Sequence, residues 1–140
     1  MTAVSRAFYE VPDRKGHTIG ILPSQPDDPQ CHPKPGYPNP WIEIPIHTHL
    51  PLTGLEGTDP QSRNHLTVLS SNIIVAFPGG VGTASEIMLA VKYNRPLIAF
   101  VEREEEIPNL SDDVSQLATL QEVQTFLISF LHPNSGFDQT

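Results

Sequence analysis

Three glycines and a threonine follow directly after a short apolar run. The run is Ile73 to Phe77, and Gly79, Gly80, Gly82 and Thr83 come within six residues of its end. Glycine lacks the Cβ atom that would keep a ligand away from the backbone. A helix that begins near Thr83 would aim unpaired N–H groups and the positive end of its dipole at the same corner. This combination suits a phosphate group, although the glycines also suit a tight turn that binds nothing.

Glu86 follows Thr83 by three residues, and this spacing has two interpretations. Thr-x-x-Glu is the pattern of a capping box, in which the glutamate side chain accepts a hydrogen bond from the backbone N–H of the N-cap residue. A carboxylate beside a phosphate site could instead bind ribose hydroxyls or assist cleavage of a glycosidic bond. The spacing favours the capping box, and the sequence leaves both interpretations open.

Alternating strands and helices must position this corner. A short helix near residues 62–72 is expected to pack through Leu66 and Leu69, and a second Thr-x-x-Glu pattern, Thr119 and Glu122, predicts the start of the last helix. Apolar runs predict strands at 17–23, 73–77 and 97–101, and apolar periodicity predicts the main helices at 2–11, 83–93 and 120–131. This alternation predicts an α/β fold with a parallel sheet, in which ligands bind at the carboxyl ends of the strands.

The chain is long enough for one domain, residues 1–140, and too short for two. Ten of its 15 prolines lie between Pro23 and Pro60. We therefore expect residues 24–61 to form a long irregular loop, because proline cannot continue a helix or sit in a central strand. "WIEIPI" is its one strand-like piece. The acidic segment 102–113 is expected to be a solvated loop.

The charge of the chain limits its partners. Eight basic and 16 acidic residues give a net charge of −8, which excludes a basic surface for nucleic acid or anionic membranes. A bound phosphate must therefore be held mainly by backbone N–H groups and one or two arginines. A single cysteine, with no signal peptide or membrane-spanning stretch, indicates a cytoplasmic protein.

The nine residues "PGGVGTASE", 78–86, resemble the PGGxGTxxE motif of the LOG-like (LONELY GUY, formerly "lysine decarboxylase-like") nucleotide-binding proteins. This Rossmann-like superfamily, SLOG, also contains the molybdenum cofactor carrier proteins. "TIGILP" and "SRNHLTVLSSN" resemble further family segments in the same order, so the resemblance covers roughly 1–23 and 41–101. It implies that a nucleotide 5′-phosphate is held by Pro78, Gly79, Gly80, Gly82 and Thr83.

The resemblance implies two alternative functions. Hydrolases of the family release a free base, such as a cytokinin, from a nucleoside 5′-monophosphate, and Arg63 and Glu86 fall at their catalytic arginine and glutamate. A carboxylate suits that reaction because it stabilises the oxocarbenium-like ribose as the base leaves. The carriers bind a nucleotide or a molybdopterin-type ligand without turnover. Asn64, where the hydrolases carry lysine, and a short motif helix make the chain more similar to the carriers. A remnant that binds nothing is the third reading.

The start of the chain departs from the family pattern. Met1 resembles the last residue of a glycine-rich GGGxxGxM loop, so about two family strands, one of them in the middle of the sheet, have no counterpart. We expect either a truncated gene product or start-site error, or a homodimer or higher oligomer that fills the gap.

The remaining polar and aromatic residues carry little signal. His32, His47, His49 and Cys31 are too loosely spaced for a zinc signature, so no metal is expected. Trp41 and Tyr37 are interpreted as packing for the long loop.

Overall fold

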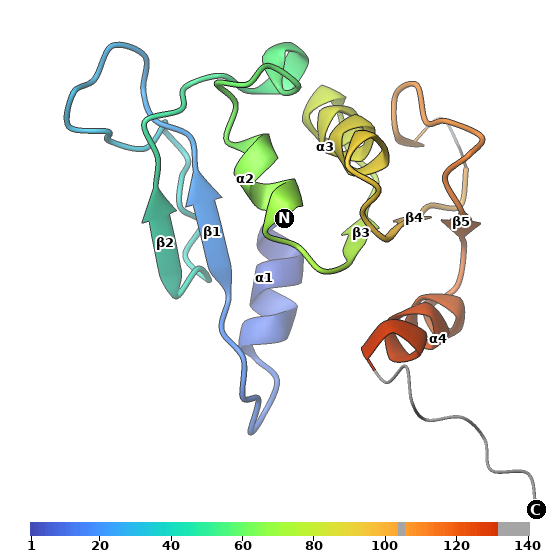
Figure 1. Cartoon of the computed structure of the whole chain (residues 1–140). Helices are drawn as coiled ribbons and strands as arrows, with labels where there is room; N and C mark the ends of the chain where they lie inside the picture. Colours follow the sequence, from blue (N-terminus) through green and yellow to red (C-terminus); the bar gives the residue numbers. More distant parts are fainter. Residues whose placement is uncertain (104–105, 132–140) are drawn as a thin grey trace, which may run out of the picture. The chain divides into compact units, whose positions relative to one another are not determined.

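The computed structural model describes residues 1–103 and 106–131 (Figure 1). The chain divides into two compact units, Met1–Thr67 and a second that begins at Val68, and each is described by itself. All pairings between named strands are parallel, which confirms the predicted α/β fold. The single domain over 1–140 stays a prediction. The elements are α1 (Thr2–Tyr9), β1 (Ile19–Leu22), β2 (Ile44–His47), a 3-10 turn (Gly54–Glu56), α2 (Asn64–Leu69), β3 (Ile74–Ala76), α3 (Val81–Lys92), β4 (Leu97–Phe100), β5 (Gln116–Leu117) and α4 (Leu120–Leu131).

The first unit contains a two-stranded parallel sheet. β1 pairs with β2 in a register that sets Ile19 opposite Ile44, so the proline-rich segment contributes one strand, as expected. The Ile44 N–H donates to the Thr18 carbonyl oxygen at 3.0 Å, and the next residue, Pro45, therefore turns its nitrogen away from β1. Because Pro45 has no N–H to offer, β2 ends the sheet on that side.

Glu43 ties this sheet to the turn after α1. Its carboxylate accepts hydrogen bonds from Arg14 Nη2 at 2.9 Å, from the Thr18 N–H at 2.9 Å and from the Thr18 hydroxyl at 3.1 Å. The Arg14 guanidinium, followed by the Thr18 N–H, lowers the pKa of Glu43 from 4.5 to about 2. The carboxylate is thus stabilised in its charged form only while the first unit is folded.

This pKa shift predicts a pH-dependent stability. Because the folded pKa is depressed, the contribution of Glu43 is fully present above pH 4.5 and is lost as the pH falls towards about 2. We expect Glu43→Gln to lower the melting temperature at pH 7, and the gap to the wild type to close on acidification through that window. Glu10→Gln, which removes an exposed ion pair with Arg6, is the control and should change little. A gap that stays constant from pH 7 to pH 2 would contradict this role.

The second unit holds a three-stranded parallel sheet in the order β3–β4–β5, with α3 as the connection between β3 and β4 (Figure 1). The register sets Ile74 opposite Leu97. A buried cluster joins the sheet, α3 and the segment between β4 and β5; its members are Ala76, Ile87, Ala99, Val101, Ile107 and Val114. The acidic segment is therefore only partly the solvated loop that was expected, because Ile107 is anchored in this core.

Two further details test the sequence predictions. The Thr119 and Glu122 capping box is confirmed, since the Thr119 N–H donates to Glu122 Oε2 at 3.0 Å and the Glu122 N–H donates to Thr119 Oγ1 at 3.3 Å. The predicted apolar contacts of α2 are wrong. Leu66 and Leu69 are 44% and 43% exposed, whereas Val68 is 1% exposed and packs with residues of α3.

Candidate functional site

The glycine-rich corner lies between β3 and α3 in the second unit. α3 begins at Val81, and its N-cap is Gly80, whose backbone is extended (φ −91°, ψ −154°). The Ala84 N–H donates to the Gly80 carbonyl oxygen at 3.2 Å, which is the first bond of the helix. The N–H groups of Val81, Gly82 and Thr83 precede this bond and have no acceptor within the helix. Unpaired N–H groups and the positive end of the helix dipole at one point favour an anion there.

The glycines of this corner are not required by backbone torsion angles. Among the described glycines, positive φ angles occur at Gly36 and Gly54, so Gly80 and Gly82 do not occupy left-handed conformations. A Cβ atom placed on either of these two would meet nothing within 4 Å. Their lack of side chains therefore leaves the surface in front of the unpaired N–H groups open, which favours a ligand over a turn that binds nothing.

Gly79 has a different role from the other two. A Cβ atom on Gly79 would lie 2.3 Å from Thr83 Oγ1 and 3.1 Å from Thr83 Cβ, so Thr83 occupies the space beside it. The Gly79 N–H donates to the Glu106 carbonyl oxygen at 3.0 Å and is not available to an anion. Gly79 thus allows Thr83 to pack closely against the backbone of the corner. Val81, which was not among the site residues predicted from the sequence, contributes an unpaired N–H in its place.

The capping-box interpretation of Thr83 and Glu86 is wrong. Both residues lie inside α3, and the N-cap Gly80 has no side-chain cap. The helix starts two residues earlier than its sequence pattern predicts, because Gly80 already supplies the first carbonyl acceptor. Glu86 is half-buried in the second turn of α3, and the helix does not begin at Thr83 as a capping box with Glu86 requires.

The structure places the two candidate catalytic residues in different units. Arg63 belongs to the first unit, directly before α2, and its Nη1 donates to Thr67 Oγ1 at 3.3 Å. Asn64 is 2% exposed and fills a buried position. Glu86 belongs to the second unit. The corner residues lie in the same unit, on the segment that leads from β3 into α3; they are Pro78, Gly79, Gly80, Gly82 and Thr83.

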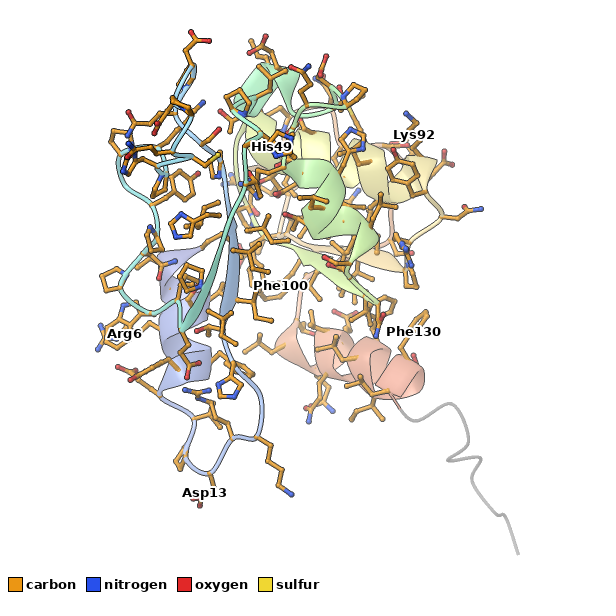
Figure 2. The ribbon with its side chains drawn as sticks, turned by 60° about the vertical axis from the view of Figure 1, so that its left-hand side comes forward. Arg6, Asp13, His49, Lys92, Phe100 and Phe130 are labelled. Carbon is orange, nitrogen blue, oxygen red and sulfur yellow. The ribbon has the colours of Figure 1, made fainter. Side chains whose placement is uncertain are left out.

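Aromatic residues of the first unit pack against arginines. The Arg6 guanidinium, labelled in Figure 2, lies 5.4 Å from the centre of the Trp41 ring, and the Tyr9 and Trp41 rings are 5.4 Å apart. Trp41 therefore packs the long loop against α1. The described residues bring no three His, Cys, Asp or Glu side chains together as a metal site requires. Within the same residues, every helix is too short or too polar to cross a membrane.

The parallel sheets and the open glycine corner at the start of α3 define a Rossmann-like α/β protein. Within that class, the chain belongs to the SLOG cluster4 family, whose family model matches residues 1–127. This membership confirms the superfamily that the corner motif resembles and indicates a nucleotide-related function at that level. No curated protein and no solved structure matches the chain significantly.

Proposed function

We propose that the protein binds a nucleotide, or a nucleotide-like cofactor such as a molybdopterin, through the corner Pro78–Thr83. The observation that carries this proposal is the open surface in front of Gly80 and Gly82, where three backbone N–H groups have no helical acceptor. Membership of the SLOG cluster4 family supports a nucleotide as the source of the phosphate. Because the chain has only eight basic residues and a net charge of −8, we expect backbone N–H groups, rather than a cluster of cations, to hold the phosphate.

Binding without turnover, as in a carrier, is the first form of the proposal. Asn64 stands where the related hydrolases carry lysine, and its side chain is buried, so this position does not present a cation to a substrate. A phosphoribohydrolase is the second form. It is favoured by the position of Glu86, a half-buried carboxylate in the second turn of the helix that begins at the corner. The protein would then release a free base from a nucleoside 5′-monophosphate.

Incubation with AMP and with an N6-substituted AMP separates the two forms. A carrier leaves both compounds intact, whereas a hydrolase releases free base that chromatography detects. In the second case, Glu86→Gln should abolish release but keep binding, since the corner N–H groups are unchanged. Release that persists in Glu86→Gln would show that another residue performs the chemistry.

The same proposal includes a homodimer or higher oligomer. β1 has one described neighbour in its sheet, β2, so the sheet can extend on the β1 side. Light scattering checks this against the chain mass of 15.4 kDa, and a particle of that mass would contradict it.

A further inference from the structure

The segment that follows β4 returns to the glycine corner. β3 and β4 are parallel neighbours, so their carboxyl ends meet at one edge of the sheet, and Phe100, at the end of β4, is labelled in Figure 2. The Gly79 N–H donates to the backbone carbonyl of Glu106 at 3.0 Å. The next residue, Ile107, is 1% exposed in the core and fixes this contact. The backbone of Glu106 is therefore held beside the corner.

The Glu106 carboxylate has capacity for another hydrogen bond. Its side chain is 22% exposed, and its Oε2 accepts the Glu102 N–H at 3.1 Å. Arg103 Nη2 lies 4.0 Å from Oε1, which is too far for a hydrogen bond. Among the described residues, none donates a hydrogen bond to Oε1.

A carboxylate in this place suits a ligand that carries hydroxyl groups. It would repel a phosphate bound alone, but it accepts hydrogen bonds from the hydroxyls of a sugar. In strand–helix–strand units that bind dinucleotides, an acidic residue about 20 residues beyond the glycine turn binds the ribose in this way. Glu106 follows the corresponding strand, β4, of the unit β3–α3–β4.

We propose that Glu106 determines specificity for a ribose-bearing ligand, with Oε1 accepting hydrogen bonds from the ribose hydroxyls. The inference rests on the proposed function and narrows it to nucleotides with an intact ribose diol. No sequence pattern indicates Glu106, because an acidic run after a strand is typical of a solvated loop. Its contact with Gly79 became visible only in the fold.

Calorimetric titration with AMP, 2′,3′-dideoxy-AMP and inorganic phosphate tests the role of Glu106. The wild type should prefer AMP over the dideoxy compound by about 10-fold or more, since hydrogen bonds to a charged group are the strong ones. Glu106→Ala should lose this preference through weaker binding of AMP, while the affinity for dideoxy-AMP and phosphate does not fall. Glu106→Gln, which keeps the size of the side chain, should lose part of the preference.

Glu102→Ala is the matched control, because it removes the same charge from an exposed side chain of the same segment. It should keep the preference for AMP. Loss of the preference in Glu102→Ala but not in Glu106→Ala would overturn the assignment. Equal binding of AMP and dideoxy-AMP by the wild type would overturn the role of Glu106 and leave the proposed function standing. Failure of the wild type to bind any of the three ligands would overturn the proposed function and this inference with it.

Discussion

Replacement of Gly82 by aspartate is expected to abolish nucleotide binding and to leave the protein folded. Gly82 lies in the first turn of α3, and a Cβ atom there meets nothing within 4 Å. A carboxylate at this point stands where the ligand phosphate would bind. Two unit charges about 4 Å apart repel by about 4 kcal/mol near a protein surface, which corresponds to a loss of more than about 100-fold in affinity.

Stability should change in the opposite direction in this variant. Glycine is a poor helix residue, and an acidic residue in the first turn interacts favourably with the helix dipole. We expect Gly82→Asp to raise the free energy of unfolding by about 0.5 kcal/mol, measured by urea denaturation. Gly82→Asn, similar in shape but neutral, should lose less affinity than Gly82→Asp. Full AMP binding by Gly82→Asp would show that the phosphate does not sit at the start of α3.

Replacement of Gly79 by alanine is expected to destabilise the protein without any ligand present. The new Cβ atom would lie 2.3 Å from Thr83 Oγ1, so either the threonine side chain or the backbone of the corner must move. Overpacking of this kind costs about 1–3 kcal/mol. Urea denaturation of the two proteins measures the difference in the free energy of unfolding.

A double-mutant cycle identifies the cause of that loss. Thr83→Ala removes Oγ1, so Gly79→Ala should cost less in this background. Thr83→Ser keeps a hydroxyl and should keep most of the cost. If Gly79→Ala costs the same in all three backgrounds, the close approach of Gly79 and Thr83 is not what makes glycine necessary.

Much of the element order could be predicted from the sequence, because local patterns encode it. The apolar runs gave β3 (Ile74–Ala76) and β4 (Leu97–Phe100) within one or two residues. The capping box at Thr119 and Glu122 set the start of α4 correctly. In each case the signal and the structure it produces lie within a few residues of each other.

The parts that could not be predicted depend on contacts between distant residues. The glycines after β3 argue locally against a helix start, yet α3 begins at Val81. The residue just before this corner, Gly79, is held by a backbone hydrogen bond to Glu106, which lies in the segment after β4. The spacing of Leu66 and Leu69 predicted that these two residues form the buried face of α2. The buried residue is instead Val68, which packs against Leu89 and Ala90 of α3. The two-residue strand β5 has too short a pattern to detect and is defined by its pairing with β4.

The phosphate-binding role of the corner is the central claim, and a comparison of AMP with adenosine tests it most directly. Both compounds carry the same base and ribose, so only the phosphate differs. Thermal unfolding with AMP at 100 times its Kd should show a stabilisation of about 2.7 kcal/mol, and adenosine at the same concentration should give much less. Equal stabilisation by both compounds, or none by either, would contradict a phosphate site at the start of α3.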